Sequence, residues 1–229
     1  MKLAVAVMAV AMWLTATSAR AQDDPEYRME IGGGAGVMNG LNDFNGNLTR
    51  HMQPAFTATL RYCLSPYMAL ALNATTGKIK GSSADVETYY PAYATTPYTF
   101  SRTLTDVSAV YEYNFWPYGT GRDYRGARRL TPYLYGGVGA TMASGSGKSV
   151  FTANMPLGMG IKYKAAERVN IIVRWAVHFS LSDKLDGVKD PYEVKSSGLF
   201  KNTDCYSGLT IAVTYSFLPK CKTCNKDDF

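Results

Sequence analysis

Eight short segments of the chain alternate apolar and polar residues with a period of two, and Val169–Leu181 shows the pattern best. Its apolar positions are Val169, Ile171, Val173, Trp175, Val177 and Phe179. The positions between them include Asn170, Arg174, His178 and Ser180. Successive side chains of a β-strand point to opposite faces, so each segment is predicted to be a strand with one apolar and one polar face.

The eight predicted strands follow one another at hairpin spacing. They cover about Tyr27–Met38, Phe56–Leu64, Met68–Ala74, Val107–Phe115, Thr131–Ala143, Leu157–Tyr163, Val169–Leu181 and Leu209–Phe217. Loops are predicted at Asn39–Gln53, Gly77–Arg102, Ser144–Ala153 and Ser182–Asp204. Shorter connections are predicted at Ser65-Pro66, Trp116–Arg129 and Ala165–Glu167. The phase of the fifth strand stays open, because Tyr133, Leu134 and Tyr135 put apolar residues on both faces.

Alternation alone does not say which face meets lipid, since a soluble eight-stranded lipocalin turns its apolar face inward. Three features favour an apolar face turned outward. The connections alternate in length, as in barrels with one end at the cell exterior and the other in the periplasm. Tyrosines gather on the apolar face at the short-turn ends, where they suit the headgroup level of a membrane: Tyr27, Tyr62, Tyr113, Tyr163 and Tyr215. The polar face carries charges of both signs: Arg28, Glu30, Arg61, Asp106, Glu112, Lys162 and Arg174.

These features together predict an all-β protein. The expected architecture is an eight-stranded antiparallel up-and-down transmembrane β-barrel with long extracellular loops and short periplasmic turns. Such a barrel would be integral to the outer membrane and in contact with its lipid, with both termini in the periplasm.

The N-terminus has the features of an export signal. Lys2 precedes an apolar run from Leu3 to Leu14, and Ala19-Arg20-Ala21 fits a cleavage site, so cleavage is expected between Ala21 and Gln22. The predicted domains are a signal peptide (1–21), the barrel (22–218) and a periplasmic C-terminal tail (219–229). Removing the signal lowers the net charge from +6 to +4, because Lys2 and Arg20 are lost and no acid is. The mild charge and the exported location both argue against nucleic-acid binding.

The interior of an eight-stranded barrel is just wide enough for side chains, so we expect neither a diffusion pore nor a cofactor. With two histidines and no acidic cluster at ligand spacing, no metal site is predicted either. His178 and Ser180 share a face, and Asp183 follows closely, so a small hydrolase or acyl-transfer enzyme is an alternative. A hydrogen-bond network in the lumen explains the same residues, and no catalytic residue is therefore predicted.

The four cysteines are informative about location. Cys63 and Cys205 should lie at opposite ends of strands about 30 Å long, so they cannot bond to each other. Cys221 and Cys224 lie in the polar tail and hence in the oxidising periplasm. A local disulfide between them, a bond to Cys63 and a bond to another protein all remain open.

Several stretches resemble the PorG family, the outer-membrane barrel of the type IX secretion machinery of Bacteroidota. The similar stretches are Tyr27–Gly36 (YRMEIGGGAG), Thr131–Gly139 (TPYLYGGVG), Pro156–Tyr163 (PLGMGIKY), Arg174–Val188 (RWAVHFSLSDKLDGV) and Asp204-Cys205-Tyr206. The resemblance covers essentially the whole mature chain. It implies a non-enzymatic protein that anchors a periplasmic ring, made of a lipoprotein and its soluble partner, to the outer membrane.

Candidate partner contacts follow from that implied role. The connection after the fourth strand carries four arginines that fit partner contact but also suit any solvated turn: Arg122, Arg125, Arg128 and Arg129. Cys221 and Cys224 lie beyond the barrel pattern, so no family role is carried to them, and their contact with a ring component is a hypothesis. A surface adhesin that acts through Gly77–Arg102 and Ser182–Asp204 is a further alternative.

Overall fold

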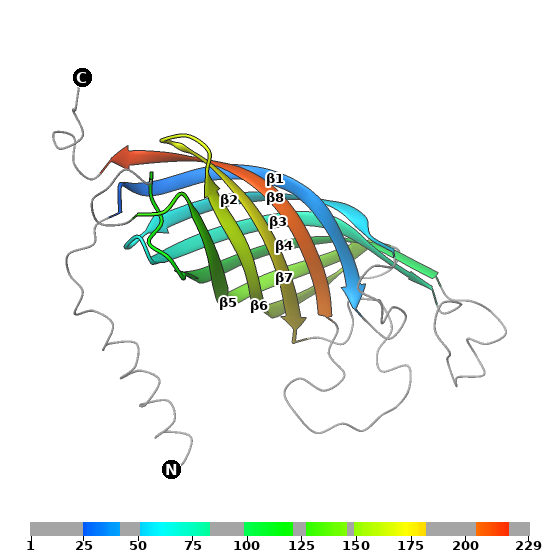
Figure 1. The fold of residues 1–229 in the computed structure, drawn as a ribbon. Coiled ribbons are helices and arrows are strands. Elements are labelled where there is room, and N and C mark those ends of the chain that lie inside the picture. The colour runs from blue at the N-terminus through cyan, green and yellow to red at the C-terminus, as the bar shows by residue number, and fades with distance from the viewer. Residues whose placement is uncertain are drawn as a thin grey trace, which may run out of the picture.

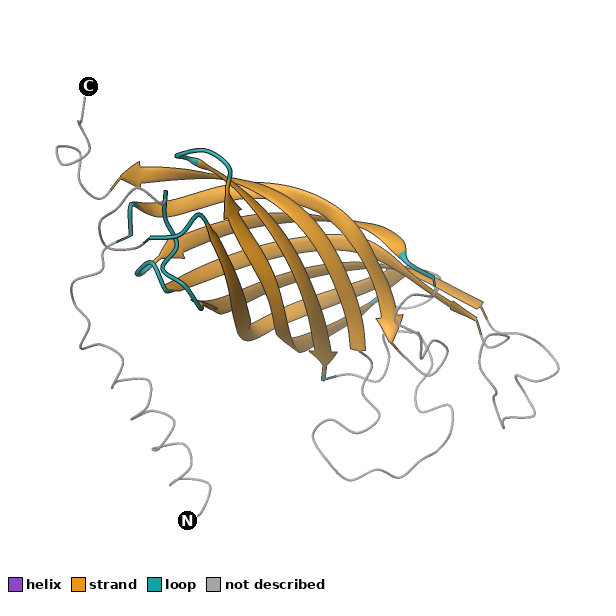
Figure 2. Ribbon diagram, viewed as in Figure 1, coloured by secondary structure: helices purple, strands orange, loops and turns teal. Residues whose placement is uncertain are grey.

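The computed structural model describes residues 25–41, 51–82, 99–120, 127–145, 149–181 and 205–219. They form a closed antiparallel barrel in which each strand pairs with its neighbours in sequence (Figure 1). The strands are β1 (Tyr27–Leu41), β2 (Gln53–Cys63), β3 (Met68–Ser82), β4 (Thr99–Asn114), β5 (Leu130–Gly145), β6 (Val150–Lys164), β7 (Val169–Ser180) and β8 (Cys205–Pro219). Strands and their connections make up the described structure (Figure 2). The predicted eight-stranded barrel is confirmed.

Within the described ranges, no helix is long and apolar enough to cross a membrane. The predicted cleavage site at Ala21 and Gln22 lies outside the described residues, as does the tail from 220 onward.

The first and last strands close the barrel. β1 pairs with β8 from Tyr27↔Pro219 at one rim to Leu41↔Cys205 at the other. A Cβ on Gly32 would fall 2.1 Å from the carbonyl oxygen of Val213 on β8. The glycine run of β1 therefore lets the two strands approach closely at this seam.

The two rims differ in their connections. We call the rim with connections 64–67, 115–129 and 165–168 the short-turn rim, and the opposite one the long-loop rim. The predicted tight turns are confirmed, because the backbone N–H of Leu64 donates to Met68 O and that of Ala165 donates to Val169 O, both at 2.9 Å. The predicted loops Gly77–Arg102 and Ser144–Ala153 are too long. β3 and β4 extend into the first from both sides, and β5 and β6 leave only residues 146–149 between them.

The apolar positions face outward and the polar positions inward through most of the wall. Ile31, Leu72 and Val213 are 53%, 49% and 53% exposed, whereas Arg61 and Glu112 are each 1% exposed. The tyrosine girdle is confirmed at four positions, all of them exposed at the short-turn rim: Tyr62, Tyr113, Tyr163 and Tyr215.

The start of β1 departs from the prediction. Tyr27 is buried, and its hydroxyl donates to Glu167 of the β6–β7 turn, whereas Arg28 is exposed instead of facing the lumen. Leu218 lies between the β8 partners of Tyr27 and Met29 and has a φ of 56°, in the left-handed region. The distorted pairing at this point shifts the side chains out of strict alternation.

The open phase of the fifth strand is settled by its neighbour. Tyr133 and Tyr135 of β5 face inward, while Leu134 is 45% exposed. In register, Tyr133 lies opposite Gly160 and Tyr135 opposite Gly158 on β6. Both tyrosine rings occupy the space that a β6 side chain would fill.

Candidate functional site: the filled lumen and the short-turn rim

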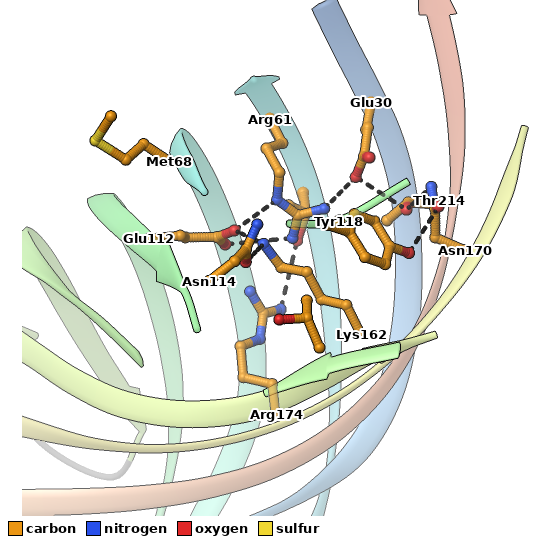
Figure 3. Close-up of polar contacts among 12 residues, drawn as sticks. Glu30, Arg61, Met68, Glu112, Asn114, Tyr118, Lys162, Asn170, Arg174 and Thr214 are labelled. Carbon is orange, nitrogen blue, oxygen red and sulfur yellow. Dashed lines mark hydrogen bonds and ion pairs between the residues drawn. The ribbon is translucent and has the colours of Figure 1, made fainter. Parts of the chain in front are cut away.

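Four buried charged side chains, which we call the lumen charge cluster, cross the barrel near the short-turn rim (Figure 3). Arg61 of β2 lies between two carboxylates. Its Nε donates to Glu112 Oε2 at 2.7 Å and its Nη1 donates to Glu30. Lys162 of β6 donates to Glu112 Oε2 at 2.7 Å and to Asn114 Oδ1 at 2.9 Å. Two acids balance two bases, so these ions stabilise one another only while all four are present.

Arg174 of β7 crosses the middle of the lumen among neutral partners. Its Nη1 donates to Asn73 Oδ1 at 2.6 Å, and its Nη2 donates to the hydroxyls of Thr57 and Thr59 at 3.1 and 3.4 Å. Its Nε contacts Thr210 Oγ1 at 3.4 Å. Arg174 thus faces inward as predicted, and hydroxyl and amide oxygens rather than carboxylates satisfy its guanidinium.

A second polar cluster lies nearer the long-loop rim. Asp106 Oδ2 accepts from Thr141 Oγ1 at 3.2 Å and from the Asn154 amide. The ring of Tyr206 stacks on His178, with centroids 4.4 Å apart and an interplanar angle of 15°. His178 Nδ1 lies 3.7 Å from Asp106 Oδ1, which is beyond hydrogen-bond distance.

The catalytic alternative involves residues of this second cluster. His178 and Ser180 both face the lumen. The Ser180 hydroxyl donates a hydrogen bond to the hydroxyl of Thr152, at 3.5 Å, rather than to a nitrogen of His178. Asp183 lies outside the described residues, and Asp106 of β4 is the carboxylate beside His178 instead. The sequence pattern missed this pairing, because β4 and β7 are distant in sequence and meet only across the lumen.

Side chains fill the lumen between these clusters. One cavity of about 30 Å³ is lined in part by Arg174, His178 and Ser108. Another of about 20 Å³ is lined in part by Arg61 and Cys63. Since a water needs roughly 10–15 Å³, the first has room for about two or three waters and the second for about one or two. The described lumen is a packed core, as expected for eight strands.

The connection between β4 and β5 folds over the short-turn mouth. We call residues 117–120 the rim plug. The Tyr118 hydroxyl donates to Asn170 Oδ1 at 2.8 Å, and burial raises the pKa of Tyr118 above its ordinary value, which keeps the hydroxyl protonated as a donor. Glu26, ahead of β1, accepts from the backbone N–H of Thr120 at 2.7 Å and pairs with Lys164 at 3.2 Å. The plug is thereby tied to β7 and to the segment ahead of β1, which Lys164 in turn joins to β6.

Two exposed arginines, Arg128 and Arg129, follow the plug and are held by hydrogen bonds to its backbone carbonyl groups. The guanidinium of Arg128 lies 4.9 Å above the ring of Trp116, and Arg128 N donates to Pro117 O at 2.7 Å. Arg129 Nε donates to Thr120 O at 2.6 Å. The predicted contact residues Arg122 and Arg125 lie outside the described residues, as do Cys221 and Cys224.

Cys63 and Cys205 occupy opposite rims, as expected. Cys63 ends β2 at the short-turn rim, and Cys205 begins β8 at the long-loop rim. No disulfide joins Cys63 and Cys205 to each other within the described part of the chain. Within the described ranges, no three His, Cys, Asp or Glu side chains are grouped so that they could hold a metal ion.

The family model described as a domain of unknown function, DUF6089, matches residues 7–226. The chain belongs to the DUF6089 family. No curated protein matches this DUF6089 member.

Solved structures show what this DUF6089 barrel is similar to. Neisserial surface protein A (NspA), an outer-membrane barrel of eight strands, is 11% identical with a TM-score of 0.53, over 82% of this chain and 97% of its own. Ail of Yersinia pestis is 12% identical with a TM-score of 0.48, over 84% and 99%. The outer membrane enzyme PagL is 12% identical with a TM-score of 0.38, over 82% and 99%. The match to NspA shows that the fold is that of an integral outer-membrane β-barrel.

Proposed function

We propose that this chain is a non-enzymatic outer-membrane anchor of the type IX secretion machinery, with its short-turn rim in the periplasm. Its partners would be a periplasmic ring lipoprotein and the soluble partner of that lipoprotein. The resemblance to the PorG family suggests these partners. The observation that carries the proposal is the short-turn rim itself, where a fixed backbone presents Arg128 and Arg129 to solvent.

The rim has the properties of a docking platform. Thr120 N–H and the Tyr118 hydroxyl of the plug donate hydrogen bonds to Glu26 and Asn170, so the plug is already ordered before a partner binds. Arg128 is held over Trp116, and arginine on an aromatic ring is a frequent anchor of protein interfaces. A basic surface of this kind suits an acidic partner face. The packed lumen supports a scaffold rather than a conduit.

The tail adds a covalent hypothesis. Cys221 and Cys224 follow β8, which ends at the short-turn rim, so we expect both thiols on the side where the ring would dock. We expect at least one of them to contact a ring component. A local disulfide between them is the alternative outcome.

Crosslinked outer membranes test the proposal. Arg128→Glu/Arg129→Glu should leave the barrel folded and inserted but reduce the ring lipoprotein that is recovered with it at least fivefold. Arg128→Lys/Arg129→Lys is the matched control, and it should keep most of the recovery because the charge is retained. Non-reducing gels of the same membranes would show whether the tail thiols link to a partner. Equal recovery from the charge-reversed and wild-type barrels, with no disulfide-linked partner, contradicts the proposal.

A further inference from the structure

The outward face of the described barrel carries very few charges. Of the charged side chains in the eight described strands, eight are buried and three are exposed: Arg28, Lys78 and Lys80. Arg28 lies at the short-turn rim. Lys78 and Lys80 lie together on the outer face of β3 toward the long-loop rim, two residues apart. No acidic residue of these strands is exposed, so no carboxylate of the described strands offsets the repulsion between the two ammonium groups.

The height of this pair on the wall is informative. Lys78 follows Met68 by ten residues along β3, and Met68 pairs with Tyr113 of the tyrosine girdle. Ten residues at about 3.3 Å each, tilted by about 40°, rise by roughly 25 Å, which is the usual height of the lipid-facing band. If the girdle marks one membrane interface, Lys78 lies at the other and Lys80 about 5 Å beyond it. That is the depth of lipid headgroups.

The surroundings of the pair are hydroxyl groups. Lys78 lies opposite Thr103 and Lys80 opposite Ser101 on β4. We call the outward residues at this level the lysine patch, in which Thr103 is half-buried and the others are exposed: Thr76, Lys78, Lys80, Ser101, Thr103 and Thr105. Thr76 and Thr105 form the lowest row of the patch, and aromatic rings flank this row on both sides. Thr76 pairs with Phe56 on β2, and Thr105 pairs with Met142 on β5, which in turn pairs with Phe151 on β6.

The backbone of the patch is well supported. Ile79 and Leu104 point inward from the same two strands and are 1% and 0% exposed. β3 and β4 stay paired beyond their other neighbours, and Figure 1 shows them reaching past the rest of the barrel at the loop end. Within the described residues, neither Lys78 nor Lys80 has an ion-pair or hydrogen-bond partner. The patch lies on two paired strands, and among the described residues its two charges have no counter-ion.

We propose that the lysine patch binds a phosphate monoester on the sugar headgroup of a glycolipid in the adjacent leaflet. Two lysines match the charge of about −1.5 to −2 that a phosphate monoester carries near pH 7, whereas a phosphodiester carries only −1. The hydroxyls of Ser101 and Thr103 can pair with sugar hydroxyls. The apolar rings below the patch continue the lipid-facing band and receive the acyl chains. This inference does not depend on the secretion role.

Native mass spectrometry tests the proposal. The full barrel is placed in nanodiscs of phosphatidylcholine, and bis-phosphorylated lipid A is added as the probe. The wild type should retain one lipid A. Lys78→Gln/Lys80→Gln should bind it at least tenfold more weakly, with a smaller dependence on salt. Lys78→Arg/Lys80→Arg should retain binding. Arg28→Gln/Arg168→Gln removes two exposed charges at the opposite rim and should bind as the wild type does.

The remaining outcomes overturn the proposal. Equal lipid A retention by Lys78→Gln/Lys80→Gln would show that the patch does not hold the headgroup. Equal affinity for phosphatidylglycerol would exclude a preference for the monoester. No lipid A binding by the wild type, with an acidic protein that co-purifies only when the lysines are present, would make the patch a protein interface. Heat-modifiable gel mobility confirms that each variant is folded.

Discussion

At the scale of single residues, the lumen holds two arginines in opposite electrostatic settings. Arg61 is shared between Glu30 and Glu112, and its loss would leave two buried carboxylates facing Lys162 alone. Arg174 is surrounded by neutral oxygens, and its loss would strand no charge. The cost of removing a buried ion depends on what it leaves behind.

We therefore predict a ranked series of stabilities. Arg61→Met should destabilise the barrel by about 3–5 kcal/mol, because one buried negative charge becomes uncompensated. Arg174→Leu should cost about 1–3 kcal/mol, since only neutral acceptors lose a donor. Val173→Ala, on the lipid face, should cost least, because lipid replaces the lost contacts. The temperature at which unboiled protein loses its folded gel mobility measures the series.

The order of the series is the critical result. If Val173→Ala were as damaging as Arg174→Leu, the assignment of faces would be wrong. If Arg174→Leu exceeded Arg61→Met, a hidden anion beside Arg174 would be needed to explain it.

The sequence predicts which charged residues face the lumen, but not which residues they contact there. The inward positions of Arg61, Glu112 and Arg174 follow from alternation. The contact partners of these side chains do not follow from alternation. A period of two assigns each residue to a face of the strand, but it gives neither its height in the barrel nor its neighbour across the lumen. The contact between His178 and Asp106 is of this kind.

At the scale of elements, β5 and β6 fit together because large side chains on one strand lie opposite glycines on the other. The polarity of these residues does not decide the fit. Tyr133 and Tyr135 are apolar enough for either face, which is why the sequence left their strand open. The deciding information lies on β6, where Gly158 and Gly160 leave space for the rings. The alternation pattern of a single strand contains no information about the size of the residues on the neighbouring strand.

A methyl group on β6 should expose this dependence. Gly160→Ala would place a Cβ 2.4 Å from Val173 O and 2.7 Å from the Tyr133 ring, so we expect a clear loss of thermal stability. Gly33→Ala is the matched control, since its nearest neighbour would be Thr57 O at 3.3 Å. Thermal unfolding of the two variants in one detergent makes the comparison. A similar midpoint for both would mean that β6 moves to accommodate the side chain.

The over-long predicted loop Gly77–Arg102 has a related cause. Near the long-loop rim the pattern inverts, with Ile79 and Leu104 pointing inward and Lys78 and Thr103 outward. Beyond the lipid-facing band a strand still alternates, but its polar residues face outward and its apolar residues face inward. Apolar-outward patterning therefore ends before the strand does.

At the scale of the whole molecule, the fold was the best-predicted property. Strand number, order and closure all followed from hairpin rhythm, because neighbouring segments of an up-and-down barrel pair in sequence order. The orientation in the membrane stays a prediction, with the short-turn rim expected in the periplasm and the long-loop rim at the cell exterior.

Labelling of intact cells would assign the compartments. In a background without the four native cysteines, a cysteine at Ser83 should react with a membrane-impermeant maleimide from outside. A cysteine at Asn225 should react only after the outer membrane is permeabilised. Both positions lie outside the described residues, next to strands whose rims are known. Labelling at Asn225 but not at Ser83 would invert the barrel.

The seam between β1 and β8 sets a direction for anything attached to the tail. Pro219 pairs with Tyr27 at the short-turn rim, and Cys221 and Cys224 follow two and five residues later. At no more than about 3.5 Å per residue, their tethers reach roughly 7 and 18 Å from the seam. A partner bonded to Cys221 would therefore lie close to the β1–β8 seam, at one position on the barrel circumference. A ring held through Cys221 would have a fixed rotational register relative to each barrel that carries it.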